Sequence, residues 1–504
     1  MNDMSYKPAG AKISLSGQPI ETGLAQRITQ VVVRQSLDTP ALAEITIVDP
    51  FDGLSERFAA GTALGVDLRT GGKLFSGAVA GLEHHYLADG GRVLKVRAHD
   101  ALETLRSKRR FRVVEGVSPV DAWSEAASGL GLDVRATVEG TPCTSVQTGT
   151  SDLTFLVSLA RAQGIHAVLD GEAVRLVSLA GFGETIEVSP GGRLIAVKVE
   201  EAGEDVSRLG RAYGWSAASA GTFAATAPTA RQDEEIELSA FALSGLHEDE
   251  GHLFAANLPS GSQGEVQAAA QDMMDRSAAN QTVATGTLRG SADFRPGVRL
   301  RLAGLGFRAP PTVVMTTATH VFDARQGNVT EFSSRPPPPL KAECVPVVTL
   351  GRVIDIADPD GGARVKVALP AFGDIELGFL SLVVAGAGAG KGAAALPDVG
   401  DDVIVLFPSS DLAHGLVLGG IYGAARLPRG TTTQHPRALV LASGGDQRLV
   451  LGGARATASL LTSSGDRLSL GGGRSQLTVA GDLEIAAIGG TITIKAQKVN
   501  FERI

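Results

Sequence analysis

Several short stretches of the chain contain residue types that could support chemistry, and the most suggestive of them is rich in glycine. Residues 385–395 read AGAGAGKGAAA, which invites comparison with a phosphate-binding loop. That motif requires Gly at position 385 and Ser or Thr at position 392, where the chain has Ala385 and Gly392. It also requires a strand before it and a helix after it, and the surrounding sequence indicates neither. We therefore interpret the run as a mobile loop of a barrel and expect no nucleotide binding.

Histidine-containing stretches could supply metal ligands, but their spacing is wrong. His84 and His85 are neighbours in an expected strand, so their side chains point to opposite faces of it. No Cys or acidic residue follows them at the spacing of a metal site. His247-Glu248 begins like the helix of a zinc protease, but Gly251 stands where the second His is needed. We expect a surface histidine pair, a solvated acidic loop and no metal site.

Nucleophilic and hydrolytic chemistry has equally little support. No GxSxG motif marks a reactive serine, and the LSGL and PSGS stretches are typical of turns. Cys143 and Cys344 lie far apart without a partner motif, which fits a reducing compartment and shows no metal or redox signature. Paired carboxylates for glycoside cleavage have no local signature, so that alternative stays open. The sequence predicts no catalytic, cofactor-binding or metal-ligating residue, and we expect the protein not to be an enzyme.

Length and composition point to a large protein rich in β-structure. A chain of 504 residues predicts three or four domains with sizeable cores. Gly accounts for 63 residues, about twice its usual share, while aromatic residues make up only 5%. This favours many short strands and tight turns. The net charge of −8 argues against nucleic-acid binding. The one basic cluster, Lys108-Arg109-Arg110 with Arg106 and Arg112, is short enough to be a solvated edge.

The sequence also carries information about location. Residues 1–10 lack the charged and then apolar pattern of a leader, and no apolar run of 18 residues occurs. We therefore expect a protein that is made in the cytoplasm without a cleaved signal peptide.

Residues 397–423, PDVGDDVIVLFPSSDLAHGLVLGGIYG, form the stretch around which the rest of the chain is organised. Val403, Val405 and Phe407 alternate with Ile404 and Leu406, which predicts a strand that is apolar and buried on both faces. Other strands are expected at 351–356, 363–369, 376–384 and 415–421, with the strong turn signal DPDGG between the first two. Five short strands so close together predict a small closed barrel of the OB type.

The chain before this stretch is expected to form a β-rich segment, a segment with helices and a hairpin, a second β-rich segment and a linker. Strands separated by turns are expected at 12–15, 27–35, 43–49, 63–69, 73–82 and 92–99. Residues 105–180 add a helix capped by Ser118 before Pro119, a second helix from Ser151, and a hairpin. Residues 195–335 return to strands around one helix, which opens with a capping box at Ser262. Residues 335–339, RPPPP, predict a stiff linker and a domain boundary.

The chain after it, residues 438–504, repeats short alternating apolar pairs such as Leu468/Leu470, and Gly-Asp turns separate some of them. Strands this short with a single apolar face cannot bury that face within one chain. The pattern therefore predicts that several chains associate into a β-prism.

Three pieces of the chain also resemble a known family. GRVIDIADPDGGARVKVALPAF, AGAGKGAAALPDVGDDVIVLF and LVLGGIYG occur in the order and spacing of the OB-fold domain of VgrG spike proteins. These proteins tip type VI secretion systems and related contractile injection machines, and they match the hub and spike of phage tails. Upstream, SDLTFLVSLARAQGIHAVLDGEAVRLV and DFRPGVRLRLAG resemble segments of the VgrG hub. The chain departs from the family pattern at Phe372, where a Trp is expected, and at His166, where a Tyr is common; His166 is read as a packed strand residue.

The resemblance implies a mainly β fold in five parts. They are a first hub β-barrel (1–104), an α/β hub insertion (105–194), a second hub β-barrel with one helix (195–340), an OB-fold domain (341–430) and a β-helical (β-prism) needle (431–504). In this family three chains wind together to form the needle. The implied trimer core of the needle consists of Leu468, Leu470, Leu477, Val479, Leu483, Ile485, Ile492 and Ile494.

The function that the resemblance implies is mechanical. It is the hub–spike of a contractile injection machine, a homotrimer that adapts a six-fold inner tube to a three-fold membrane-piercing needle and helps to deliver cargo. The implied partners are the inner tube, baseplate proteins, effector cargo and a PAAR-type tip protein that docks on Val499, Phe501 and Ile504. A target membrane is contacted only on puncture, and the compact hub and short needle favour a particle released extracellularly. A phage tail spike and a spike with a concealed hydrolase are the alternatives, although no stretch resembles the lysozyme insertion of some phage spikes.

Overall fold

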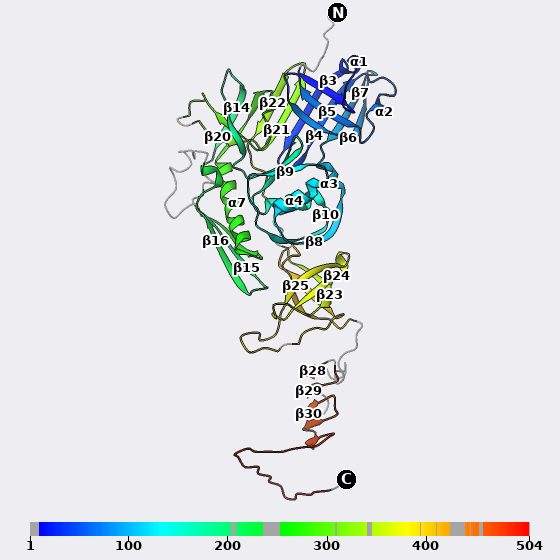
Figure 1. Cartoon of the computed structure of the whole chain (residues 1–504), viewed down its shortest axis with the longest axis vertical. Coiled ribbons are helices and arrows are strands. Elements are labelled where there is room, and N and C mark those ends of the chain that lie inside the picture. The colour runs from blue at the N-terminus through cyan, green and yellow to red at the C-terminus, as the bar shows by residue number, and fades with distance from the viewer. Residues whose placement is uncertain are drawn as a thin grey trace, which may run out of the picture. The chain divides into compact units, whose positions relative to one another are not determined.

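A computed structural model of the chain (Figure 1) describes residues 10–202, 207, 209–234, 252–307, 310–339, 345–393, 395–409, 411–423, 439–443, 445–452 and 457–502. The chain divides into two units, residues 1–420 and residues 421–504.

The N-terminal part of the first unit is a strongly alternating antiparallel sheet. In β3 (Ile28–Ser36) and β4 (Thr39–Val48), alternate side chains point into one core and are completely buried. They are Val31, Val33, Ile45 and Ile47. All six strands predicted for this region are present, and β2 is an additional short strand. The elements are β1 (Ala11–Leu15), β2 (Gln18–Pro19), α1 (Thr22–Ala25), β3 (Ile28–Ser36), β4 (Thr39–Val48), α2 (Leu54–Arg57), β5 (Ala63–Leu68), β6 (Lys73–Tyr86) and β7 (Arg92–His99).

The next part mixes helices and short sheets, as the sequence predicted. The side chains of Ser118 and Ser151 cap two helices by accepting hydrogen bonds of 3.1 Å from the backbone N–H groups of Asp121 and Thr154. Trp123 is fully buried between these helices. The elements are α3 (Glu103–Ser107), β8 (Arg109–Val117), α4 (Pro119–Ser128), β9 (Asp133–Ala136), β10 (Cys143–Ser151), α5 (Asp152–Arg161), β11 (His166–Asp170) and β12 (Ala173–Val177).

Residues 182–333 supply the second set of hub strands. Their elements are β13 (Phe182–Val188), β14 (Leu194–Glu201), β15 (Leu209–Ser216), β16 (Gly221–Ala227), η1 (Arg231–Glu234), β17 (His252–Pro259), α7 (Gln263–Gln281), β18 (Thr282–Arg289), β19 (Val298–Leu302), β20 (Thr312–Val314), β21 (Thr317–Asp323) and β22 (Gly327–Ser333). Strand β21 pairs with β3, with Val321 opposite Val32. The two predicted hub barrels therefore share one sheet of eleven strands, in the order β14-β18-β22-β21-β3-β4-β7-β6-β5-β1-β2.

Helix α7 lies along β15 and β16 because the facing side of that sheet has small residues (Figure 1). A Cβ atom added at Gly210 would come within 2.7 Å of the carbonyl oxygen of Ala270, and one at Gly214 within 2.5 Å of Val266. Side chains at those positions would push the helix off the sheet. The predicted capping box opens this helix, since the Ser262 hydroxyl accepts a hydrogen bond of 3.4 Å from the Glu265 N–H.

The predicted OB-type domain is a closed five-stranded barrel in the order β23-β24-β25-β27-β26. Its elements are β23 (Val347–Asp355), β24 (Arg364–Leu369), η2 (Pro370–Phe372), β25 (Ile375–Leu382), β26 (Asp402–Phe407) and β27 (Leu416–Gly420). Val403, Val405 and Phe407 are completely buried inside the barrel. Ile404 and Leu406 point outward and are only partly buried. The sequence predicted a strand buried on both faces. In the single chain only the inward face is fully buried.

The second unit contains one antiparallel sheet. Its strands are β28 (Leu439–Ala442), β29 (Arg448–Gly452), β30 (Thr457–Leu461), β31 (Arg467–Leu470) and β32 (Gln476–Thr478), each paired with the next. Residues 479–502 are described without any strand. The sequence predicts short alternating strands throughout residues 438–504, and the described residues contain five of them, all before residue 479.

Candidate assembly surfaces

The sheet of the second unit has one entirely apolar face. Cross-strand partners in an antiparallel sheet share a face, and here leucine pairs with leucine: Leu439 with Leu451, Leu449 with Leu460, and Leu468 with both Leu460 and Leu477. We call this surface the leucine face. Its members are Leu439, Leu441, Leu449, Leu451, Ala458, Leu460, Leu468, Leu470 and Leu477.

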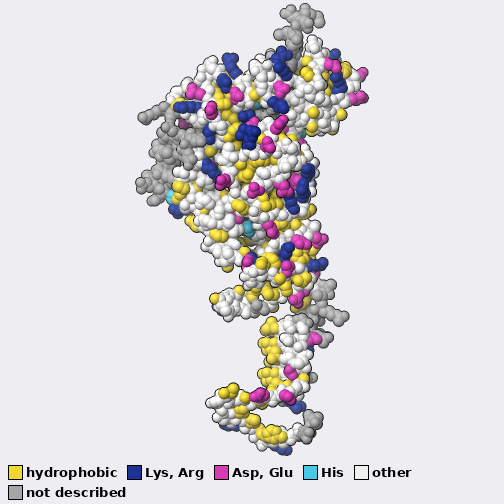
Figure 2. All heavy atoms as spheres, viewed as in Figure 1, with side chains coloured by type: hydrophobic (Ala, Val, Ile, Leu, Met, Phe, Trp, Pro, Cys, Tyr) yellow, Lys and Arg dark blue, Asp and Glu magenta, His cyan; other side chains and the backbone are white. Residues whose placement is uncertain are grey.

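The leucine face is open to solvent in the single chain. Leu441 is 56% exposed, Leu460 47% and Leu468 37%, and Figure 2 shows hydrophobic side chains gathered along one side of this sheet. The opposite face is mixed: Ser459 pairs with Ser469 and with Val450, and Leu461 lies between Arg448 and Arg467. A contiguous apolar surface of this kind marks an interaction site.

Three of the predicted needle-core residues, Leu468, Leu470 and Leu477, lie on the leucine face. The other five follow β32, outside any strand; all but Val479 are among the exposed hydrophobic residues. They are Val479, Leu483, Ile485, Ile492 and Ile494. The predicted needle core did not include the other leucines of this face, which are Leu439, Leu441, Leu449, Leu451 and Leu460. The alternation of Leu460 with Ala458 was an available signal.

The predicted docking site for a tip protein falls at the end of the described chain. Val499 is 50% exposed and Phe501 is 93% exposed. Ile504, the third predicted contact, lies outside the described residues, as does Cys344.

The proline-rich linker is held by arginines from two different helices. Arg276 of α7 donates a hydrogen bond of 2.8 Å to the carbonyl oxygen of Pro337, and Arg161 of α5 donates to that of Pro338. The Thr316 hydroxyl donates a bond of 2.6 Å to the Arg335 carbonyl oxygen. Prolines lack an N–H and cannot join a strand ladder through it, so side-chain donors satisfy these carbonyl groups and fix the linker on the hub.

A buried Asp–His pair joins the first hub strands to the α/β part. His166 is completely buried in β11, and its Nδ1 lies 2.7 Å from Oδ2 of Asp38 in the β3–β4 turn. Asp38 also accepts a hydrogen bond of 3.0 Å from the Ala167 N–H and lies 3.5 Å from Nε of Arg161. In the described part of the chain, Nε2 of His166 has no hydrogen-bond partner, so no nucleophile is poised on the ring. This cluster holds the turn in place, consistent with the reading of His166 as a packed strand residue.

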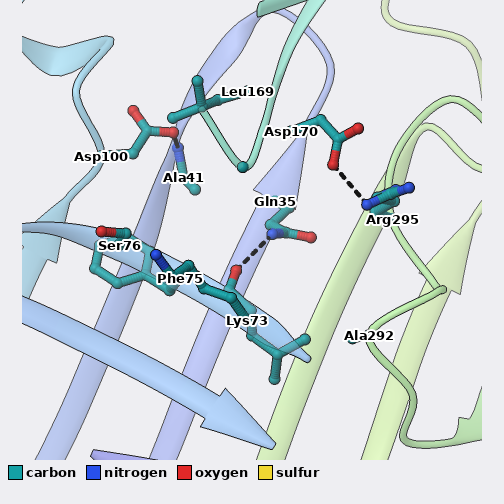
Figure 3. A pocket seen from close by; sticks show the side chains of 12 residues that line it. Gln35, Ala41, Lys73, Phe75, Ser76, Asp100, Leu169, Asp170, Ala292 and Arg295 are labelled. Atoms are coloured by element: carbon teal, nitrogen blue, oxygen red, sulfur yellow. Dashed lines mark hydrogen bonds and ion pairs between the residues drawn. The ribbon is translucent and has the colours of Figure 1, made fainter. Parts of the chain in front are cut away.

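A small pocket lies where strands of the first hub part meet the β11–β12 turn and residues 292–295 (Figure 3). Asp170 and Arg295 face each other there at 2.5 Å. Asp100 accepts hydrogen bonds from the backbone N–H groups of Ala41 (2.8 Å) and Leu102 (3.0 Å). Burial raises the pKa of Asp100 to about 6 despite these bonds. The pocket lies where separate parts of the hub meet.

The glycine-rich run, the histidine pair and Cys143 can each be located in the fold. Residues 385–393 form an exposed loop between barrel strands, with a backbone bridge between Gly388 and Lys391. His85 pairs with Glu83 at 2.7 Å, and no cluster of metal-ligating side chains occurs among the described residues. Burial raises the pKa of the Cys143 thiol to about 11, which keeps it protonated at neutral pH. The 247–250 segment lies outside the described residues.

Two cations of the basic cluster around the start of β8 are ion-paired, and a third is hydrogen-bonded to an amide. Its three arginines with acidic or amide partners are Arg106 with Glu103 (3.2 Å), Arg110 with Asp152 (3.0 Å) and Arg112 with Gln147 (2.8 Å). This arrangement fits a solvated edge. None of the helices in the described ranges combines the length and the apolar character needed to cross a membrane.

Several solved structures have a fold similar to that of this chain. An E. coli protein, c3393, described as a type VI secretion component with structural similarity to the T4 tail proteins gp27 and gp5, is 13% identical; the match covers 81% of this chain and 99% of that one with a TM-score of 0.51. A chain of the half-lidded Francisella PdpA–VgrG complex is 9% identical; the match covers 93% of this chain and 87% of that one with a TM-score of 0.52. A lidless PdpA–VgrG complex gives 10% identity, 95% and 100% coverage and a TM-score of 0.52.

Family models agree with the fold. Residues 349–422 match the type VI secretion system/phage-baseplate injector OB domain, which corresponds to the closed barrel. Residues 7–323 match the Alg8 N-terminal domain, a span that includes all the hub strands except β22. No curated protein sequence matches the chain. The chain therefore belongs to the Alg8 N-terminal domain family, carries a phage-baseplate injector OB domain, and has the fold of VgrG-type hub–spike proteins.

Proposed function

We propose that the protein is the structural hub–spike of a contractile injection machine and that it works as a homotrimer. The observation that carries this proposal is the leucine face of β28–β32. Eight leucines and one alanine share one side of a sheet whose strands are three to five residues long. Strands this short cannot curl over their own apolar side, so other copies of the chain must cover it.

A trimer would suit both the hub strands and the leucine face. Each chain contributes two groups of hub strands, those of the first hub part (β1 to β7) and those that follow the α/β part (β14, β18, β21 and β22). Three chains would therefore present six groups in a ring, which suits a six-fold inner tube, while three leucine faces meet on a three-fold axis. In this proposal the inner tube and baseplate proteins seat on the ring, and the needle leads the cargo through the target membrane.

The end of the needle is the proposed site of a PAAR-type tip protein. Val499 and Phe501 expose apolar side chains. If neighbouring chains order this segment into strands, their open edges would accept further strands from the tip protein. The predicted core residues from Val479 to Ile494 would be ordered by the neighbouring chains. Deletion of residues 497–504 should leave the trimer intact and release the tip protein in a pull-down; retention of the tip would place its docking site elsewhere.

The proposed role requires no covalent chemistry from this chain. The protein would be made in the cytoplasm and assembled into a particle. Purified protein is expected to leave peptidoglycan, nucleotides and peptides intact, and measurable turnover of any of them would favour the spike with a concealed hydrolase.

The decisive experiment is the mass of the purified full-length chain in solution. Light scattering should give about three times the chain mass of 51.8 kDa, and this mass should persist on dilution. A stable monomer would refute the proposal.

A further inference from the structure

Helix α7 presents a row of glutamines to the free edge of strand β16, along which it lies (Figure 1). Strand β16 is an outer strand of the sheet β16-β15-β17, and no other described strand pairs with its second edge. Three side-chain amides, one from each turn of the helix, donate hydrogen bonds to backbone carbonyl oxygens of β16 and the residues after it. The bonds run from Gln263 to Ala224 (2.7 Å), from Gln267 to Thr226 (3.0 Å) and from Gln271 to Thr229 (2.9 Å). We call these three glutamines the glutamine ladder.

The ladder forms because the spacing of the helix matches the spacing of the strand. Four residues advance about 6 Å along a helix axis, and two residues advance about 6.7 Å along a strand. A helix that runs alongside a strand edge can therefore place one side chain of each turn beside every second carbonyl group. Asp275, one turn beyond the ladder, continues the row by accepting a hydrogen bond of 2.8 Å from the Arg231 N–H.

Other outer strands of the hub carry known devices against the addition of a further strand. On β14, at one end of the eleven-stranded sheet, the exposed side chains of Lys198 and Glu200 form an ion pair. At the other end of that sheet, β2 has only two residues, and one of them is Pro19. Strand β17 is bulged where it pairs with β15, and Asn257 there has a positive φ of 59° and accepts a bond of 3.0 Å from the Trp215 indole N–H.

Strand β16 has none of these devices. Its sequence, GTFAATA, contains no charged residue and no proline, and its pairing with β15 runs without a register shift. An uncharged, regular edge of this kind is open to a strand from another molecule. We propose that the glutamine ladder guards this edge: by occupying carbonyl oxygens on its open side, it prevents an extended strand of another copy of the chain from pairing with β16.

Removal of the ladder from the full-length chain tests this inference. Gln263→Ala, Gln267→Ala and Gln271→Ala are combined, because alanine favours a helix and supplies no side-chain donor. Sedimentation velocity then compares this triple variant with wild type over a range of protein concentrations. Species larger than the wild-type assembly should appear at a concentration at least ten-fold lower than in wild type, while circular dichroism shows the same helix content. Equal mass distributions in two folded proteins would overturn the inference.

A different edge device supplies the control. Ala224→Lys and Thr226→Lys, at exposed positions of β16, place two charges on the strand and should return the triple variant to the wild-type mass distribution. Larger species that persist despite these lysines would show that they arise from loosened helix packing, and would also overturn the inference. If the triple variant does not fold, Gln267→Ala, which removes the middle bond alone, is measured in the same way. Because every variant is compared with wild type, a monomeric wild-type chain would refute the proposed trimer and leave this comparison unchanged.

Discussion

The leucine face allows a sharp test of how the chains associate. Leu460 and Leu468 are cross-strand partners at its centre, 47% and 37% exposed in the single chain. Replacing both with Asp places two carboxylates per chain, and hence six in three chains, on the proposed apolar axis. We expect the trimer to dissociate while the hub stays folded.

The magnitude follows from burial. Complete burial of a leucine stabilises by about 1.5–3 kcal/mol, and since the sheet already covers about half of each side chain, trimer formation contributes about 1 kcal/mol per leucine. Six lost leucines therefore cost about 6 kcal/mol, which lowers the association constant by about 10⁴-fold. Each carboxylate forced into the axis adds several kcal/mol to the cost. The combined loss removes the trimer at micromolar concentration.

Sedimentation or light scattering at micromolar concentration measures the outcome. The matched control is Ser459→Asp, one residue from Leu460 but on the opposite face, where its partners are Val450 and Ser469. This control should remain trimeric. A trimeric Leu460→Asp/Leu468→Asp double variant would refute the inward orientation of the leucine face. Dissociation of both variants would show that any charge in β30 disrupts the sheet.

Two further predictions concern the hub. Burial raises the pKa of Asp100 to about 6 and lowers that of His320 to about 4. Between about pH 4 and 6 the folded protein holds a proton on Asp100 that the unfolded chain has lost, so the free energy of unfolding falls by about 3 kcal/mol as pH rises. His320 has the opposite effect: the unfolded chain holds the proton that the folded protein has lost, so rising pH increases the free energy of unfolding by a similar amount. Calorimetry should show that, relative to wild type, Asp100→Asn gains stability and His320→Gln loses stability as pH rises through this window. If the stability of each variant changes with pH as that of wild type does, neither residue has the shifted pKa. Arg276→Ala should destabilise the hub by about 1–3 kcal/mol in denaturant unfolding, because it removes the bond to Pro337 and leaves Asp272 unpaired; an unchanged midpoint would show that the linker is held by other contacts.

Local sequence signals predicted the individual elements well. The strands of residues 11–99, the caps at Ser118, Ser151 and Ser262, and the closed barrel all follow from alternation, turn residues and capping side chains that lie close together in the chain. Each of these signals is read within about ten residues.

The pairing of strands that are far apart in the chain could not be predicted from the sequence. The β3–β21 ladder pairs Val32 with Val321 and joins two parts of the hub that the sequence presented as separate barrels. Nothing near either strand specifies its partner, because valine-rich strands have many acceptable neighbours. The same holds for the contacts of Arg276 with Pro337 and of His166 with Asp38, which depend on tertiary packing.

A comparison of two strands shows what an apolar pattern does determine. In β3, Val31 and Val33 lie in the main hub core, while Val32 on the other face is buried to 5% exposure with Val321 and Val329. In β26, which has the same pattern, Val405 is completely buried but Ile404 and Leu406 face outward and are only partly covered. The pattern thus specifies that both faces need cover and leaves open whether that cover comes from the same chain. Where the single chain supplies that cover on one face only, as in β26, or leaves an apolar face open, as in β28–β32, the unmet burial identifies a surface suited to an interaction.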